Sequence, residues 1–161
     1  MPKQDKTNAM RILEAHKVVY KILDYSESGA VSGEEVAEFL GVPKEKCFKT
    51  LVTQGKSGEY YVFDVPVNKE LDLKKAAFIV SEKYVEMIKS KDLLRLTGYI
   101  HGGCSPVGMK KFFRTTFDVS AKNFDKIYFS GGRIGSFLEV SPKDLEKVIK
   151  FSFADITLTN G

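Results

Sequence analysis

A glycine-rich stretch at residues 97–111 has residue types that could hold an anion. It contains the pair Gly102-Gly103, followed by Ser105 and Pro106. Glycine permits positive φ and close approach of other backbone, and proline fixes φ and extends the residue before it. A loop constrained in this way can point several backbone N–H groups at one oxyanion or phosphate. The alternative interpretation is a tight turn between strands with no ligand, because glycine clusters alone are weak motifs.

Lys49 is the second candidate for chemistry, because it lies inside an expected strand at residues 48–53. Alternation along a strand puts Lys49 on the same face as Leu51 and puts Thr50 on the other face. A lysine in this position either guards a strand edge or directs its ammonium group into a cavity. Because lysine is rarely buried, the residues alone favour the edge guard.

The elements that must position these residues alternate between short helices and strands. The second glycine cluster, Ser130-Gly131-Gly132, lies between expected strands at residues 126–129 and 137–140. Other strands are expected at residues 18–25, 48–53, 59–65 and 84–87, with an alternating apolar segment at 112–119. Helices are expected at residues 7–15, 32–40, 71–78 and 90–96, and from residue 141 through Leu145, Val148 and Ile149. This order predicts one mixed α/β domain over residues 1–161, with a mixed sheet or β-barrel core flanked by short helices.

The composition fits a globular domain. The chain has 161 residues, of which 43% are hydrophobic, and its net charge of +4 is a mild bias towards anionic partners. Residues 1–6 are polar, which indicates no export signal, and no apolar run approaches the roughly 20 residues needed to cross a bilayer. The two cysteines and two histidines have no metal-like spacing. We therefore expect no metal or cofactor, and a cytoplasmic protein with free thiols.

Three groups of motifs follow one order along most of the chain, from about Tyr25 to Ile156. The first is FKTLV at residues 48–52, and the second is LDLKKA at 71–76 with VEM at 85–87. The third combines TGY at 97–99, GG at 102–103, SP at 105–106, KK at 110–111 and SGG at 130–132. In this combination the chain resembles the YbaK/EbsC family of aminoacyl-tRNA deacylases, which are free-standing relatives of the editing domain in prolyl-tRNA synthetases.

The resemblance implies a fold and an activity. The family has a mixed β-barrel core flanked by helices, and it cleaves the ester between the amino acid and the terminal adenosine of mischarged tRNA. The most similar members remove cysteine from tRNA(Pro), so a trans-editing Cys-tRNA(Pro) deacylase is expected, with Cys-tRNA(Cys) or a small amino acid such as alanine as alternatives. Such editing is needed because a synthetase pocket excludes a competitor of similar size by only about 10–200-fold.

The resemblance also assigns site residues, and it reverses the edge-guard interpretation of Lys49. Lys49 matches the pocket lysine of the family, whose ammonium group would meet the terminal adenosine or polarise the ester, and it is expected to be catalytic together with Gly102. Tyr25 and Thr50 match substrate-binding positions. The other residues expected to bind substrate lie in the two glycine loops: Gly103, Ser105, Pro106, Ser130, Gly131 and Gly132.

Some residues depart from the family pattern. Ser32 stands where an aromatic residue is common, and Phe137 stands where some members carry an aspartate, which weakens any role for a carboxylate there. Cys104 occupies a position that is more often aliphatic. It is not expected to be a nucleophile, because no paired histidine is identifiable and His101 is a weak candidate.

The sequence shows no Ser–His–Asp set, and the resemblance implies a mechanism that needs none. The thiol of the substrate would attack its own ester carbonyl and release a cyclic thiolactone, while the protein supplies positioning and oxyanion stabilisation. The expected partners are the aminoacylated 3′ end of tRNA and prolyl-tRNA synthetase, with neither membrane nor DNA. Two other interpretations stay open: a non-catalytic tRNA- or synthetase-associated binding module, favoured by Ser32 and Phe137, and a nucleotide or phosphate sensor, favoured by the glycine loops.

Overall fold

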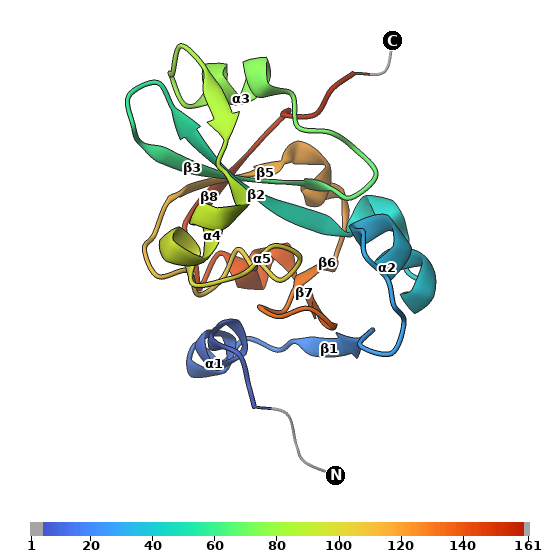
Figure 1. Ribbon diagram of the computed structural model, residues 1–161. Coiled ribbons are helices and arrows are strands. Elements are labelled where there is room, and N and C mark those ends of the chain that lie inside the picture. The colour runs from blue at the N-terminus through green and yellow to red at the C-terminus, as the bar shows by residue number, and fades with distance from the viewer. Residues whose placement is uncertain (1–4, 160–161) are drawn as a thin grey trace.

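The computed structural model describes residues 5–159, which form short helices around two sheets (Figure 1). The helices are α1 (Asn8–Ala15), α2 (Gly33–Leu40), α3 (Leu73–Ile79), α4 (Ser90–Thr97) and α5 (Pro142–Leu145), with 3-10 turns η1 (Lys44–Lys46) and η2 (Val119–Asn123). The strands are β1 (Lys21–Asp24), β2 (Phe48–Gly55), β3 (Tyr60–Pro66), β4 (Val85–Met87), β5 (Arg114–Asp118), β6 (Ile127–Ser130), β7 (Ser136–Val140) and β8 (Phe151–Ala154). The predicted mixed α/β fold with short flanking helices is confirmed.

Local sequence signals explain where several helices begin and end. Ser32 and Glu35 form a capping box at the start of α2, in which each backbone N–H donates to the side chain of the other residue, at 3.0 and 3.2 Å. Gly41 ends α2 in the left-handed conformation, with φ 69°. At the start of α3 the Asp72 carboxylate accepts from two backbone N–H groups. These helix ends were readable from the sequence because each depends on residues within four positions.

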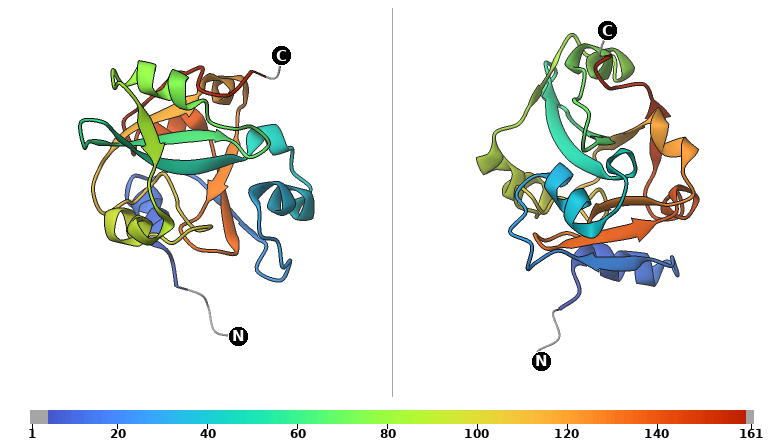
Figure 2. Two further views of the ribbon diagram at one scale, coloured as in Figure 1. Left: turned by 45° about the horizontal axis from the view of Figure 1, so that its top comes forward. Right: turned by 90° about the vertical axis from the view of Figure 1, so that its right-hand side faces the viewer.

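The strands form two sheets. The larger has the order β4-β2-β3-β5-β8, in which β2 pairs antiparallel with β3 and β4, and β5 pairs parallel with β3 and β8. The smaller sheet, β1-β7-β6, is antiparallel and lies below the larger one in Figure 1 and in the right-hand view of Figure 2, with α1 beside it. An isolated bridge between Cys47 and Tyr128 joins the sheets, and within residues 5–159 the strands do not close into a barrel.

Two elements are shorter than the sequence pattern predicts. The strand expected at residues 18–25 is reduced to β1, because the N–H of Val18 donates to the carbonyl of Leu13 and turns the chain after α1. The helix expected after Ser141 is reduced to α5 and a following turn. Val148 and Ile149 still pack against the core beyond α5. The apolar pattern therefore predicted their packing correctly and the helix length incorrectly.

The two faces of the β2–β3 hairpin contact different layers of the molecule. Val52 and Val62, which are paired across the hairpin, pack against α4 and the loop that follows it. Phe63 and Val65 pack against α3 on the opposite face. The alternation predicted for β2 is therefore confirmed, and Thr50 lies on the face that looks towards α4.

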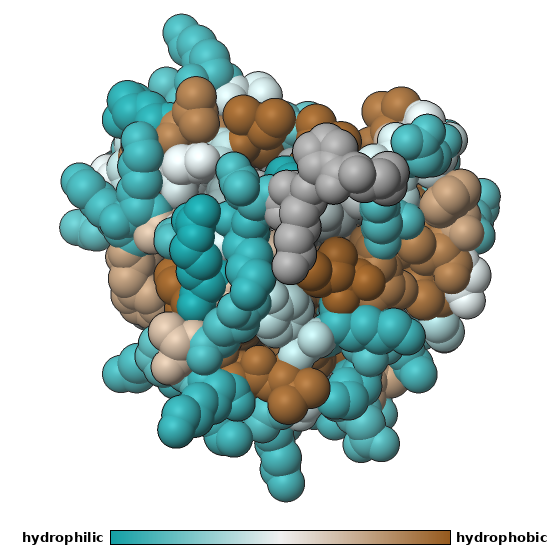
Figure 3. Space-filling view, turned by 90° about the horizontal axis from the view of Figure 1, so that it is seen from below, coloured by the Kyte–Doolittle hydropathy of each residue, from teal (hydrophilic) through white to brown (hydrophobic). Residues whose placement is uncertain are grey.

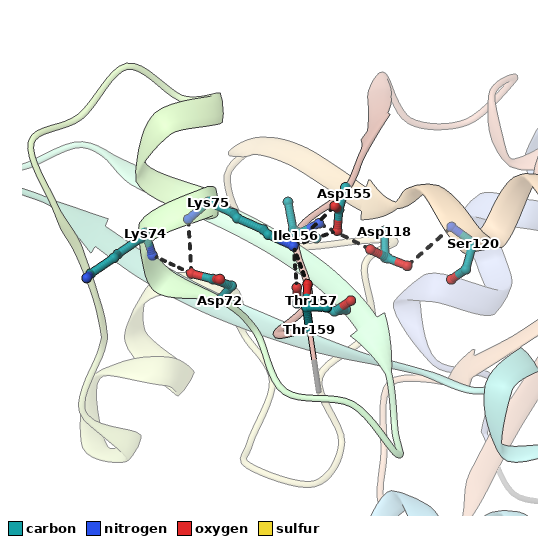
Figure 4. A network of polar contacts seen from close by, with 9 residues as sticks. All are labelled: Asp72, Lys74, Lys75, Asp118, Ser120, Asp155, Ile156, Thr157 and Thr159. Atoms are coloured by element: carbon teal, nitrogen blue, oxygen red, sulfur yellow. Dashed lines mark hydrogen bonds and ion pairs between the residues drawn. The ribbon is translucent and has the colours of Figure 1, made fainter. Parts of the chain in front are cut away.

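Polar contacts tie the end of the chain to α3 (Figure 4). The ammonium group of Lys75 donates to both carboxylate oxygens of Asp155, at 3.2 and 3.1 Å, and to the carbonyl of Thr157 at 2.8 Å. The N–H of Leu158 donates to the carbonyl of Glu70 at 2.9 Å. The segment before α3, which carries Glu70, is thereby held by the last residues that the structure describes.

The surface combines polar and apolar groups. On the face seen in Figure 3, hydrophobic residues lie in groups between hydrophilic ones. In the described part of the chain, no helix has the length and apolar character needed to cross a membrane.

Candidate active site

A cavity of about 610 Å³ lies between β2, the start of α2, the start of α4 and the two glycine loops. Its volume is in the range of about 300–1,000 Å³ that is typical of small-ligand sites. Of the predicted site residues, it is lined by Tyr25, Lys49, Thr50, Gly102 and Ser130. These residues come from widely separated parts of the chain, so the fold brings the strand and both glycine loops to one place.

In the second glycine loop, Gly131 and Gly132 are not among the lining residues. The N–H of Gly131 donates to the carbonyl of Ser136 at 2.8 Å, and the N–H of Gly132 donates to the hydroxyl of Ser130 at 3.1 Å. Both amides are therefore engaged inside their own loop, where they fix the position of Ser130. A direct contact between either glycine and a substrate stays a prediction.

In the first glycine loop, Gly103, Ser105 and Pro106 also lie outside the cavity lining. The N–H of Gly103 donates to the carbonyl of Ile100 at 2.9 Å, and the Ser105 hydroxyl accepts from the N–H of Val107 at 3.2 Å. Ser105 and Pro106 are both buried. These residues shape the loop, and their contact with substrate stays a prediction.

The two glycine loops pack directly against each other. A Cβ atom at Gly103 would lie 3.0 Å from the Cα atom of Arg133 and 3.1 Å from the backbone nitrogen of Ile134, which is too close for an ordinary contact. Gly102 has φ +87°, a conformation that favours glycine. Its N–H has no backbone partner within residues 5–159, so this donor is free to bind a ligand oxygen.

Strand β2 has a free edge where it meets the cavity. On this edge Cys47 forms its bridge to Tyr128, and pairing with β4 begins at Thr53. Between these points no strand in residues 5–159 pairs with that edge. Lys49 and Thr50 therefore both line the cavity, although they belong to opposite faces of the strand.

The ammonium group of Lys49 has an exchangeable partner. Its Nζ atom lies 3.8 Å from Oε1 of Glu70, and the two side chains are 32% and 77% exposed. A long, solvent-screened pair of this kind contributes on the order of 0–1 kcal/mol. A phosphate or carbonyl oxygen of a ligand could therefore replace the carboxylate at little cost.

Asp64 lies behind the cavity wall, in contact with the lining residue Thr50, and sequence reasoning missed it. It lies directly opposite Thr50 in the β2–β3 register, and the Thr50 hydroxyl donates to its Oδ1 atom at 2.5 Å. The side chain is fully buried. Burial raises the pKa of the Asp64 carboxyl to about 8, while the hydrogen bond from Thr50 acts in the opposite direction. The only sequence signal was an aspartate at an inward position of an apolar strand.

Cys104 lines the cavity but is unsuited to nucleophilic attack. The residue is 8% exposed, and burial raises the pKa of its thiol to about 12, with a further contribution from the nearby Asp64 charge. A thiol with this pKa is almost entirely protonated near pH 7, and the thiolate is the nucleophilic form. The expectation that Cys104 is not a nucleophile agrees with this environment.

Tyr25 and Phe137 form an apolar wall of the cavity. Both side chains are buried, and their rings meet edge to face with centroids 5.4 Å apart. The backbone N–H of Tyr25 donates to the carbonyl of Gly135 at 2.8 Å, which attaches this wall to the second glycine loop. At residue 137, where the resemblance suggested an aspartate in some members, this chain has an aromatic contact.

Comparison with known proteins shows the family. Residues 27–148 match the model of the aminoacyl-tRNA editing domain. The chain is 46% identical over 155 residues to an Enterococcus faecalis protein named "Putative Cys-tRNA(Pro)/Cys-tRNA(Cys) deacylase EbsC", covering 96% of this chain and 94% of that protein. It is 34% identical over 79 residues to the proline–tRNA ligase of Fervidobacterium nodosum, covering 49% of this chain and 14% of the ligase.

A solved structure shares the fold of this chain. The structure matches a crystal structure described as "a putative trans-editing enzyme for prolyl tRNA synthetase" with a TM-score of 0.84 and 24% sequence identity, covering 94% of this chain and 96% of that one. The chain belongs to the aminoacyl-tRNA editing domain family. The resemblance expected from the motifs is confirmed, and the class of activity is that of an aminoacyl-tRNA deacylase.

Proposed function

We propose that this protein is a cytoplasmic trans-editing deacylase that removes cysteine from tRNA(Pro). Similarity to a protein named for Cys-tRNA(Pro) and Cys-tRNA(Cys) supports the amino acid, and similarity to proline–tRNA ligases supports the tRNA. The observation that carries the proposal is the cavity itself. Lys49 and Gly102 line it together, while its thiol, Cys104, is held in the unreactive form.

This arrangement suits a reaction in which the substrate supplies the nucleophile. The sulfur of the cysteinyl group attacks the ester carbonyl carbon, so that a C–S bond forms and the C–O bond to the terminal adenosine breaks. The products are a four-membered thiolactone and the free 3′-hydroxyl, which receives the thiol proton. Holding thiol and carbonyl together makes the step intramolecular, which can supply several kcal/mol of the barrier.

Lys49 and Gly102 then stabilise the transition state. Negative charge develops on the carbonyl oxygen as sulfur attacks, and preorganised donors lower the energy of that charge. The free N–H of Gly102 and the ammonium group of Lys49 are the donors assigned to it. The apolar wall of Tyr25 and Phe137 would contact the rest of the bound terminus.

Prolyl-tRNA synthetase is the partner we assign to this protein. The 79-residue similarity to a proline–tRNA ligase supports a shared substrate. The net charge of +4 is small for a protein that must select one tRNA alone. We therefore expect weak, salt-dependent tRNA binding that the synthetase strengthens.

The test is a panel of tRNA(Pro) molecules carrying cysteine, alanine or proline, offered to the pure protein. Cysteine should be released fastest, and prolyl-tRNA should be left intact. Faster release of alanine would make the protein an alanine-clearing deacylase. Binding of all three without release of any would identify a non-catalytic binding module.

A further inference from the structure

Asp64 stands out among the buried groups around the cavity because its carboxyl is only half satisfied. Its Oδ1 atom accepts from the Thr50 hydroxyl, and its Oδ2 atom is buried with no hydrogen-bond partner in residues 5–159. A buried carboxyl is costly unless it is fully hydrogen-bonded, and an apolar side chain would fill the same position more stably. A group kept at such a cost beside a cavity is a candidate for function.

The contact between Asp64 and Thr50 determines what Thr50 can offer to a ligand. A threonine hydroxyl has one proton to donate and two lone pairs that accept. Its proton is directed to Oδ1 of Asp64, on the buried side of the strand pair, and the proton that the Asp64 carboxyl carries below about pH 8 then lies on Oδ2. The hydroxyl oxygen of Thr50 therefore presents acceptor lone pairs to the cavity that it lines.

We propose that Asp64 is a positioning residue which fixes Thr50 as a hydrogen-bond acceptor for the α-ammonium group of the bound aminoacyl ester. Asp64 touches no substrate and acts only through Thr50. An aminoacyl ester has acceptor oxygens at its carbonyl and ester positions, and the α-ammonium group is its strongest donor. Lys49 and Gly102 are donors suited to those oxygens, so Thr50 supplies the complementary acceptor. This inference rests on the proposed function, and it names the part of the substrate that the site recognises.

The test compares two substrates that differ only at the α-carbon. One is cysteinyl-tRNA(Pro), and the other carries a 3-mercaptopropionyl ester, which keeps the thiol and the chain length but lacks the α-ammonium group. The α-ammonium group also activates the ester carbonyl by withdrawing electrons, so each kcat/KM is divided by the uncatalysed cleavage rate of the same substrate. For the unmodified protein this ratio should fall about tenfold or more when the group is removed, because a charge-assisted hydrogen bond is lost. For Thr50→Val, which keeps the shape of the side chain, the ratios for the two substrates should lie within about threefold of each other.

Asp64 is tested in the same assay by a conservative change. The side-chain oxygen of asparagine can still accept from Thr50, so Asp64→Asn should retain most of the discrimination between the two substrates, whereas Asp64→Leu should lose it. Thr50→Ser keeps the hydroxyl and should also discriminate. Thr53→Val is the matched control, because Thr53 lies in the same strand and donates to the carbonyl of Tyr61 without lining the cavity. It should discriminate as the unmodified protein does.

The outcomes separate this inference from the proposed function. If the unmodified protein does not cleave cysteinyl-tRNA(Pro), the proposed function fails. If it does cleave it, and Thr50→Val still discriminates between the two substrates as strongly, the inference is overturned while the function stands. Because Thr50→Val keeps the buried aspartate and the side-chain volume, its result is decisive even if Asp64→Leu does not fold.

Discussion

Two buried aspartates of the larger sheet serve different regions of the molecule. Asp118, at the end of β5, accepts a hydrogen bond on each carboxylate oxygen, from the backbone N–H groups of Ser120 and Ile156 (Figure 4). Asp64, in β3, accepts from Thr50 on one oxygen and has no partner for the other within residues 5–159. The first carboxylate only connects chain segments and is fully satisfied. The second lies behind the cavity, and its single contact orients a side chain that can meet a ligand.

The largest effect should come from Lys49→Ala on the cavity side. Deacylation of cysteinyl-tRNA should fall at least about tenfold, because a preorganised donor to developing charge is lost. The fold should remain, since the only ion pair of Lys49 in the described residues is the long contact with Glu70. Single-turnover deacylation and circular dichroism check the two expectations. Full activity in this variant would remove Lys49 from the mechanism.

Gly103→Ala should damage the packing of the two glycine loops. The added methyl group would meet the backbone of Arg133 and Ile134 at 3.0–3.1 Å, so the loops must separate. Overpacking of this kind costs about 1–3 kcal/mol of unfolding free energy, and deacylation should fall as Gly102 moves. Urea denaturation and kcat/KM are the measurements.

The control for this substitution is Gly58→Ala at the β2–β3 hairpin. A Cβ there has nothing within 4 Å, but Gly58 has φ +95°. The Gly58→Ala variant should lose about 1 kcal/mol of unfolding free energy because of backbone strain, and its deacylation activity should be unchanged. Equal kcat/KM in both variants would show that contact between the loops is unimportant for the site.

The raised pKa of the buried Asp64 carboxyl should make the stability of the protein depend on pH. Its folded-state pKa of about 8 lies above the ordinary aspartate pKa of 3.8, so between these values the folded protein binds a proton that the unfolded chain has released. This contribution makes stability fall as pH rises through that window, by up to about 1.4 kcal/mol per pH unit, and level off above pH 8. The substitution Asp64→Asn removes this pH-dependent contribution, because asparagine does not titrate.

Urea denaturation of both proteins between pH 5 and pH 9 measures the contribution of Asp64. The stability of Asp64→Asn relative to the unmodified protein should increase up to about pH 8 and then remain constant. A difference that does not change with pH would mean that the Asp64 carboxyl is ionised in the folded state throughout this range.

The smallest effect should come from Lys75→Ala in the polar network of α3. Its ammonium group contacts Asp155 and Thr157, and none of these three residues lines the cavity. Unfolding free energy should fall by about 1 kcal/mol, because the contacts are partly exposed. The kcat/KM for cysteinyl-tRNA should be unchanged. A loss of activity as large as that of Lys49→Ala would erase the distinction between the two regions.

Much of the fold was predictable because its signals are local. The capping box at Ser32 and the turn at Gly41 depend on neighbouring residues, and the helix that they delimit was predicted over residues 32–40 from the sequence. The lengths of β1 and α5 were not predicted, because tertiary contacts end these elements before their apolar patterns end. Closure into a barrel could not be decided from the sequence, since it depends on pairings between distant strands.

The site was predictable in part, for a similar reason. Motif resemblance identified Lys49, Thr50 and Gly102, which line one cavity. The free edge of β2 explains why Lys49 and Thr50 both reach it, and strand alternation alone does not show this. Asp64 was missed because its role depends on its pairing partner across the hairpin. A single aspartate in an apolar strand carries no sequence signal of that contact.

The most direct test of the mechanism replaces the sulfur of the substrate by oxygen. The deacylation rates of cysteinyl-tRNA(Pro) and seryl-tRNA(Pro) are measured with the same purified protein under single-turnover conditions. Attack by the substrate's own thiol predicts rapid release of cysteine and release of serine that is slower by at least about tenfold, because a hydroxyl group is far harder to deprotonate than a thiol. Equal rates for the two substrates would contradict thiol-assisted cleavage and would show that a water molecule held in the cavity attacks the ester.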